Sequence, residues 1–152
     1  MKQLEFRQFL PVTLEEAWDF FSSPKNLEVI TPGDVNFKII SELPEKIYPG
    51  LIITYQIKVL PASRFKWITE ITEVRHLEFF VDEQRKGPYR RWRHEHYFRK
   101  VNDGVLMTDR LYYDIGKLVF GWVAGKLFVH QKVKEIFAFR YNKLEELFVK
   151  KL

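Results

Sequence analysis

Residues 91–113 read RWRHEHYFRKVNDGVLMTDRLYY, two alternating runs joined by Asn102-Asp103-Gly104. Alternation with a period of two places successive side chains on opposite faces of a β-strand. An Asp-Gly pair favours a tight turn because it readily supplies the positive φ values that two-residue hairpins need. The stretch therefore predicts an antiparallel hairpin.

The strand pattern extends upstream of this hairpin. Residues 35–113 are rich in Ile, Val, Thr and aromatic side chains and hold about six strand-like runs between Pro and Gly turn signals. A further strand is expected over residues 4–10, ended by Pro11. Together these runs predict an antiparallel meander.

Two short helices are predicted between the first strand and the rest. Thr13 and Glu16 form a capping-box pattern ahead of an apolar face, which predicts a helix over about residues 14–21. Leu27 and Ile30 indicate a second short helix that ends before Thr31. We assign the rings at the end of the first helix, Phe20 and Phe21 included, to the core.

After Gly116 the apolar period changes from 2 to 3.6, which predicts one long C-terminal helix. Its apolar stripe consists of Val129, Val133, Ile136, Phe137, Leu144 and Leu147. At about 100° per residue, Arg140 falls near the middle of this stripe. The element order predicts an α+β fold in which the long helix covers the sheet, with residues 1–152 as a single domain.

Composition limits the possible chemistry. The chain has 152 residues, 46% of them hydrophobic, which suffices for a packed core. It has no cysteine, so disulfides, thiolate metal sites and thiol catalysis are excluded. No apolar run approaches the ~20 residues of a membrane helix, and we expect a cytoplasmic protein. The rings Phe120 and Trp122 are candidates for an apolar lid that touches a membrane.

The chain resembles the START-like (SRPBCC) helix-grip superfamily, especially its bacterial polyketide cyclase/dehydrase branch and the birch pollen allergen. Some members of that branch are fused to nucleotide-sugar-epimerase-like domains. The residues that carry the resemblance are Pro11, Val12, Ala17, Trp18, Phe20, Pro24, Asn26, Leu27, Ile30, Thr31, Pro32, Gly50, Tyr55, Trp67, Ile71, Phe80, Asp82, Gln84, Gly87, Pro88, Trp92, His94, His96, Phe98, Asp109, Tyr113, Phe137, Arg140 and Leu144.

The resemblance implies a curved antiparallel sheet of about seven strands wrapped around the C-terminal helix, with a cavity between them. The two short helices would partly close that cavity. Function stays open, because this superfamily contains carriers, receptors, chaperone cofactors and enzymes on one scaffold.

Strand parity predicts which polar groups face this cavity. Since the charged residues of the 91–99 run must face water, Trp92, His94 and His96 face inward. The same parity places Asp82 and Asp109 on the inner face of their strands. The concave face would then collect two imidazoles and two carboxylates opposite Arg140.

Arg140 keeps its charge when buried and therefore needs a carboxylate partner. One hypothesis is a structural network in which Asp82 or Asp109 pairs with Arg140 and ties the helix to the sheet. The other is that Arg140 anchors the anionic group of a bound molecule. Both remain open at this stage.

Two further kinds of chemistry fit the same side chains. His94 and His96 with one of the carboxylates could hold a metal ion, although the pattern is weak and we predict no metal or other cofactor. A His-Asp pair could also serve as general base for a cyclisation or dehydration. Whether the protein is an enzyme, and which residues would be catalytic, is left undecided.

Basic residues also cluster in one hairpin over residues 85–100. Seven cations with two interleaved rings resemble a single-strand nucleic-acid surface, and within the hairpin only Glu95 offsets them. They are Arg85, Lys86, Arg90, Arg91, Arg93, Arg99 and Lys100, with Tyr89 and Tyr97. A solvated strand face has the same pattern, and we expect no stable nucleic-acid binding.

These observations predict a protein that binds a small, largely apolar molecule, lipid-like or polyketide-like, with a polar or anionic end. We expect the apolar wall of the cavity to consist of Tyr55, Trp67, Trp92 and Tyr113. The polar contacts to the ligand are expected from Asp82, His94, His96, Asp109 and Arg140. The alternatives are a cyclase or dehydratase with the same cavity and an interaction module with a filled interior. A drug-sized ligand would need ~300 Å³ or more. We expect a monomer or weak dimer without a transmembrane segment.

Overall fold

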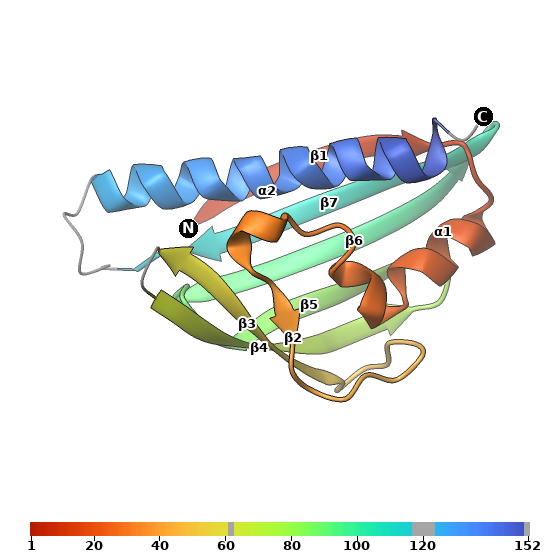
Figure 1. The fold of residues 1–152 in the computed structure, drawn as a ribbon. Helices are drawn as coiled ribbons and strands as arrows, with labels where there is room; N and C mark the ends of the chain where they lie inside the picture. The colour runs from red at the N-terminus through yellow and green to blue at the C-terminus, as the bar shows by residue number, and fades with distance from the viewer. Residues whose placement is uncertain (61–62, 117–123, 151–152) are drawn as a thin grey trace.

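One antiparallel sheet and one long helix form the framework of the structure, a computed structural model that describes residues 1–60, 63–116 and 124–150 (Figure 1). The strands are β1 (Lys2–Leu10), β2 (Lys38–Ile39), β3 (Ile52–Leu60), β4 (Ser63–Arg75), β5 (Phe79–Lys86), β6 (Arg91–Val101) and β7 (Gly104–Asp114). The helices are α1 (Leu14–Phe21), the 3₁₀ turns η1 (Pro24–Leu27) and η2 (Gly33–Val35), and α2 (Ala124–Phe148). The candidate lid residues Phe120 and Trp122 lie outside the described residues.

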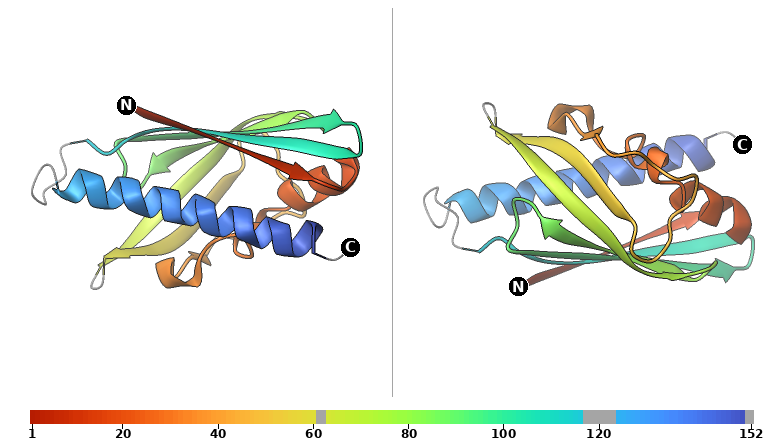
Figure 2. Two further views of the ribbon diagram at one scale, coloured as in Figure 1. Left: turned by 90° about the horizontal axis from the view of Figure 1, so that it is seen from above. Right: turned by 90° about the horizontal axis from the view of Figure 1, so that it is seen from below.

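The described residues form a seven-stranded sheet in the order β1-β7-β6-β5-β4-β3-β2. Figure 2 shows the sheet curving around α2, which crosses its concave side, while α1 and the 3₁₀ turns flank the same side. The predicted α+β helix-grip fold is therefore confirmed. The second short helix is a 3₁₀ turn, and η2 adds a third short element that the sequence did not predict.

Gly104 is required for a reason other than the predicted one. Val101 pairs with Gly104, so β6 and β7 form the expected hairpin with Asn102 and Asp103 as its loop. None of Asn102, Asp103 and Gly104 has a positive φ. A Cβ at Gly104 would instead collide with the carbonyl oxygen of Leu10, where β1 ends. Glycine is needed here for close backbone approach.

The capping box at α1 is present as predicted. The Glu16 backbone N–H donates to Thr13 Oγ1 at 3.1 Å, and the Thr13 backbone N–H donates to the Glu16 carboxylate at 2.8 Å. These bonds satisfy two amide groups at the start of the helix. They fix α1 at one end of the cavity, where Phe21 is presented to the interior.

We expect Thr13→Ala to lower the free energy of unfolding by about 1 kcal/mol, because the substitution removes this cap. Urea denaturation measures the change. Glu15→Gln is the control, since Glu15 lies in the same first turn outside the capping box. Equal unfolding midpoints for Thr13→Ala and the wild type would contradict the prediction.

The stripe of α2 packs on the sheet as its period predicted. Val133, Phe137, Arg140 and Leu144 are the buried positions of the helix, at spacings of four, three and four. Phe137 stacks on Phe6 of β1 with ring centroids 4.4 Å apart. Burial of this face stabilises α2 and brings Arg140 to the concave face of the sheet.

Candidate functional site

A cavity of about 180 Å³ lies between α2 and the concave face of the sheet. Its wall comes from α1, the two 3₁₀ turns, β3 to β6 and α2. Seven of the predicted site residues line it: Tyr55, Trp67, Asp82, Trp92, His94, His96 and Arg140. The volume is below the ~300 Å³ set for a drug-sized ligand, yet above the ~150 Å³ that admits benzene in an engineered cavity.

Aromatic rings build one end of the cavity. The Trp67 ring centroid lies 5.5 Å from Tyr55, 5.3 Å from Tyr89 and 5.1 Å from Trp92. The Tyr55 hydroxyl is fixed by Thr69 Oγ1 at 2.9 Å, and burial raises the pKa of Tyr55. This end therefore offers flat, neutral surface to a ligand.

Tyr113 lies behind this wall. Its side chain is fully buried, its ring centroid is 6.1 Å from that of Trp92, and its hydroxyl is hydrogen-bonded to His130 Nδ1 of α2. Parity placed Tyr113 on the correct face, but α2 covers it. Asp109 also lies behind the wall, beneath the two imidazoles.

His96 is held between two carboxylates. Its Nε2 is 2.8 Å from Asp82 Oδ2, and its Nδ1 is 3.0 Å from Asp109 Oδ1. Its Nε2–H donates to Asp82, and a proton on Nδ1 would face Asp109, although Nδ1 also lies 3.3 Å from Nη2 of Arg140, which is itself a donor. Burial by itself would lower the pKa of His96, but the hydrogen bonds to Asp109 and Asp82 outweigh it and raise this pKa. The two carboxylates thus favour the imidazolium form of His96.

His94 has one close carboxylate partner. Its Nε2–H donates to Asp109 Oδ1 at 2.8 Å, whereas its Nδ1 is 3.6 Å from Asp82 Oδ2, beyond hydrogen-bond distance. The His94 and His96 ring centroids are 3.7 Å apart. Burial and the neighbouring His96 charge lower the pKa of His94. His94 is therefore neutral, with an unprotonated Nδ1.

Both carboxylates are ionised. Burial by itself raises the pKa of Asp109, but the Arg140 and His94 interactions and the hydrogen bonds from His94 and His96 hold it well below its usual value. Burial by itself raises the pKa of Asp82, but the hydrogen bond with His96 and the charge interactions with His94, His96 and Arg140 together lower it. Asp109 is almost inaccessible to solvent, at 1% exposure, while the Asp82 side chain keeps 17%.

Arg140 completes a balanced set of charges. One of its terminal nitrogens, Nη2, lies 3.5 Å from Asp109 Oδ1 and 3.3 Å from His96 Nδ1. Arg140 therefore lies against both the Asp109 carboxylate and the His96 ring. Two positive groups, Arg140 and His96, thus face two negative groups, Asp82 and Asp109. We call these four residues with His94 the polar cluster.

Two donors on the cavity wall have no partner. Among the described residues, four buried side-chain polar atoms lack a hydrogen bond, and two of them belong to residues of this wall: Arg140 Nε and Trp67 Nε1. Leaving a buried donor unsatisfied costs about 1–3 kcal/mol. A structural network alone leaves this cost in place, whereas a ligand with suitably placed acceptors removes it.

The polar cluster is a poor cation site. Donor atoms of Asp82, His94 and His96 lie within 4.8 Å of one another, which is compatible with a metal ion. However, Arg140 places a fixed positive charge beside His96. This charge opposes the binding of a cation beside the two rings.

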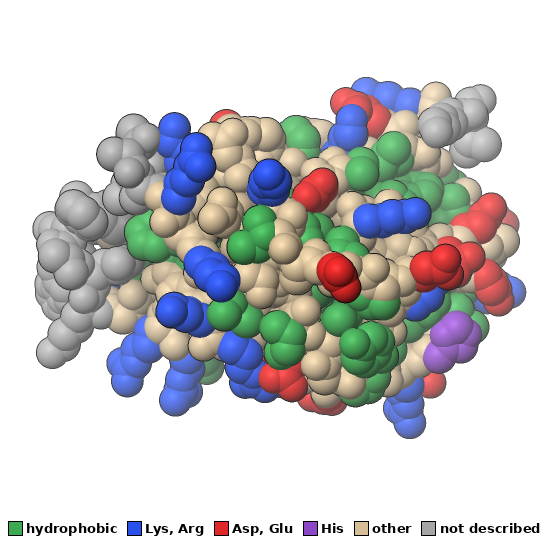
Figure 3. All heavy atoms as spheres, turned by 60° about the horizontal axis from the view of Figure 1, so that its bottom comes forward, with side chains coloured by type: hydrophobic (Ala, Val, Ile, Leu, Met, Phe, Trp, Pro, Cys, Tyr) green, Lys and Arg blue, Asp and Glu red, His purple; other side chains and the backbone are tan. Residues whose placement is uncertain are grey.

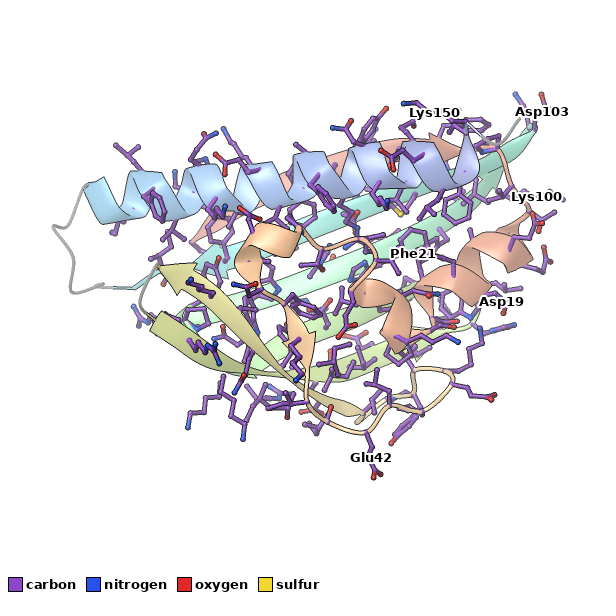
Figure 4. All side chains as sticks on the ribbon, viewed as in Figure 1. Asp19, Phe21, Glu42, Lys100, Asp103 and Lys150 are labelled. Atoms are coloured by element: carbon purple, nitrogen blue, oxygen red, sulfur yellow. The ribbon has the colours of Figure 1, made fainter. Side chains whose placement is uncertain are left out.

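Three apolar contacts at the polar cluster were not predicted as site residues. The Arg140 guanidinium carbon lies 5.6 Å from the ring centroid of Phe21 and 6.0 Å from that of Phe137. Figure 4 shows Phe21 between α1 and α2. Phe80 stacks on His96 with centroids 4.1 Å apart. Their apolar character is a sequence signal, but it does not separate cavity wall from packed core.

Acidic side chains that the structure describes pair with three of the seven basic residues of the hairpin over residues 85–100, namely Arg85, Arg90 and Arg93. Arg93 alone contacts Glu73, Glu83 and Glu95, and Arg85 contacts Glu70 at 2.5 Å. These acids come largely from β4 and β5, so counting Glu95 alone underestimated the compensation. On the face in Figure 3, Lys and Arg gather toward one end and Asp and Glu toward the other.

A groove on the outer face is lined by Arg7, Arg75, Arg99 and Arg110 beside Tyr97. Three of these arginines pair with Glu5 or Glu78. We therefore expect no detectable binding of a labelled oligothymidine in low salt, measured by fluorescence anisotropy. Micromolar binding that weakens steeply with salt and is lost in Arg91→Ala/Arg93→Ala would contradict this expectation.

In the described part of the chain, no helix is both long enough and apolar enough to span a membrane.

Comparison with known proteins identifies the fold. No protein-family model and no curated protein matches this chain. Among solved structures, a protein from Chromobacterium violaceum superposes with a TM-score of 0.73 and 9% identity, over 97% of this chain and 98% of that one. Major latex-like protein 151 from Panax ginseng gives a TM-score of 0.65 and 10% identity, over 97% of both chains.

A nucleoside-diphosphate sugar epimerase from Corynebacterium glutamicum also matches, with a TM-score of 0.66 and 22% identity. The match covers 94% of this chain but 28% of the epimerase chain. These similarities concern the fold. They confirm the helix-grip fold that the residues of this chain predicted.

Proposed function

We propose that the protein binds a small, largely apolar molecule with an anionic or polar end inside the cavity. The observation that carries this proposal is the buried, unpartnered Nε of Arg140, a residue of the cavity wall. The apolar body of the ligand would lie against Trp67 and Trp92, and its polar end would accept a hydrogen bond from Arg140. The helix-grip relatives are compatible with this function but do not specify a ligand.

The cavity volume narrows the ligand to a compact molecule. About 180 Å³ suits one or two fused rings better than an extended acyl chain. The wall of rings near Trp67 favours a flat shape, since offset and edge contacts between rings are favourable. Of the two classes that the sequence suggested, the polyketide-like class fits better than the lipid-like class.

Native mass spectrometry tests this proposal with 2-naphthoate as the probe. Ile53 and Ile52 are neighbours on β3, with Ile53 buried on the cavity wall and Ile52 exposed on the opposite face. We expect a one-to-one complex for the wild type and for Ile52→Phe, and loss of the complex for Ile53→Phe, whose larger ring fills the cavity. Equal binding by all three proteins would place the ligand elsewhere and contradict the proposal.

The His94–Asp109 pair favours a second candidate function. Asp109 fixes the tautomer of His94 so that an unprotonated Nδ1 is presented on the cavity wall. Such a nitrogen can act as general base in a cyclisation or dehydration. In that case a β-hydroxy ketone probe would lose water in the presence of the wild type but not of His94→Asn. An unchanged probe mass with both proteins would argue for binding alone.

A further inference from the structure

We propose that the ligand is a weak acid, and that the protein takes it up together with one proton, which His94 holds at Nδ1. This inference rests on the proposed function, because it concerns the charge of a molecule bound in the same cavity. It follows from the geometry of the polar cluster and from the number of charges that a buried site can hold.

The free polar cluster is already neutral. Arg140 is always charged, and His96, with one ring nitrogen against each carboxylate, is taken as an imidazolium. These two positive charges balance Asp82 and Asp109. An anion beside Arg140 would therefore leave one uncompensated negative charge in a site where His96 and Asp109 are at least 95% buried. An uncompensated buried charge is very unfavourable.

His94 is the group that can restore neutrality. Its Nδ1 is unprotonated, lies on the cavity wall and is 3.6 Å from Asp82 Oδ2. A proton on this nitrogen would face an ionised carboxylate and could form a hydrogen bond after a small movement. The other nitrogen of His94 already donates to Asp109, so the protonated ring would be held at both ends, as His96 is.

Each strand or helix packed around His94 contributes one charged group to the net charge of the polar cluster. They are Asp82 from β5, His96 on β6 itself, Asp109 from β7 and Arg140 from α2. Among these, Arg140 cannot gain a proton and His96 is already protonated. Protonation of either Asp would break its hydrogen bonds as an acceptor from His96. His94 remains as the acceptor of the proton.

A permanently charged anion is therefore not expected to be the preferred ligand. A carboxylic acid can enter the apolar cavity in its neutral form and transfer its proton to His94 once its oxygen meets Arg140 Nε. A sulfonate of the same shape has no such proton to bring. We therefore expect 2-naphthoate to bind more tightly than naphthalene-2-sulfonate at mildly acidic pH, where protons are abundant.

Isothermal titration calorimetry with 2-naphthoate in phosphate and in Tris buffer counts the protons, because these buffers differ in ionisation enthalpy. We expect uptake of about one proton per ligand at neutral pH, with affinity rising about tenfold for each unit decrease in pH until His94 titrates in the free protein. The neutral analogue 2-naphthalenemethanol should bind without proton uptake.

Two variants test whether His94 is the residue that holds the proton. His94→Asn should bind 2-naphthoate with little proton uptake, whereas His76→Asn, which alters an exposed histidine, should behave as the wild type. Proton uptake that persists in His94→Asn would overturn the assignment to His94. If His94→Asn does not fold, the two-buffer measurement on the wild type still shows whether binding takes up a proton, and binding without uptake overturns the inference.

The outcomes separate this inference from the proposed function. Binding of 2-naphthoate without proton uptake overturns the inference and leaves the binding function intact. Failure of the acid, the sulfonate and the alcohol to bind at all overturns the proposed function itself.

Discussion

Asp109→Asn is expected to lower the free energy of unfolding by about 3–5 kcal/mol, the largest stability effect that we predict for a single site. Asp109 is 1% exposed and accepts hydrogen bonds from His94 and His96 while it compensates Arg140. The amide keeps the shape of the side chain but removes its charge. Arg140 and His96 would then be buried with a single counter-charge, Asp82.

Urea denaturation at neutral pH measures this effect, with Asp114→Asn as the control. Asp114 ends the same strand, but its side chain is 30% exposed, so its replacement should matter much less. The double variant Asp109→Asn/Arg140→Met should lose less stability than the sum of the two single variants, because it removes both opposite charges together. A change below about 1 kcal/mol for Asp109→Asn would contradict the charge balance of the polar cluster.

The second large effect concerns ligand affinity. We expect Arg140→Met to weaken binding of 2-naphthoate by about 10- to 100-fold, because a hydrogen bond to a charged group contributes about 1.5–3 kcal/mol. Binding of 2-naphthalenemethanol should weaken less, since the alcohol carries no charge. Calorimetry on variants shown to be folded by circular dichroism gives both affinities.

Lys143→Met is the matched control for this comparison. Lys143 lies one helical turn from Arg140, is partly exposed and pairs with Glu146 at 3.1 Å. Its replacement removes a positive charge from the same helix without touching the cavity, so both affinities should stay at the wild-type value. Equal affinity losses in Arg140→Met and Lys143→Met would show that only the overall charge of the protein matters.

Much of the fold could be predicted from local patterns. The capping box at Thr13, the change of period after Gly116 and the alternation through His94 and His96 each describe a single element, and hydrophobic periodicity determines which face of an element is buried. The role of Gly104 could not be read in this way. The carbonyl that excludes a side chain there belongs to Leu10, which is distant in sequence.

The members of the polar cluster could also be predicted, but their pairing could not. Parity brought Asp82, His94, His96 and Asp109 to one face, and the helical stripe placed Arg140 opposite them. Which imidazole bridges two carboxylates depends on strand register and side-chain rotation, which a sequence pattern does not contain. The Nδ1–carboxylate distance is 3.0 Å at His96 and 3.6 Å at His94, which favours the charge on His96.

Two further features could not be predicted from the sequence: how deeply a side chain is buried, and which side chains on neighbouring strands it contacts. Parity shows that Tyr113 faces inward, but only the packing of α2 shows that it lies behind Trp92. On the outer face, the carboxylates that neutralise Arg93 belong to other strands as well as its own. A charge count within one hairpin misses such partners.

A crystal structure of the protein with 2-naphthoate tests the central claim most directly. The account predicts the naphthalene ring between Trp67 and Trp92, with a carboxylate oxygen within hydrogen-bond distance of Arg140 Nε and the His94 ring drawn toward Asp82. An empty cavity with the ligand on the outer surface, or a carboxylate that points away from Arg140, would contradict it.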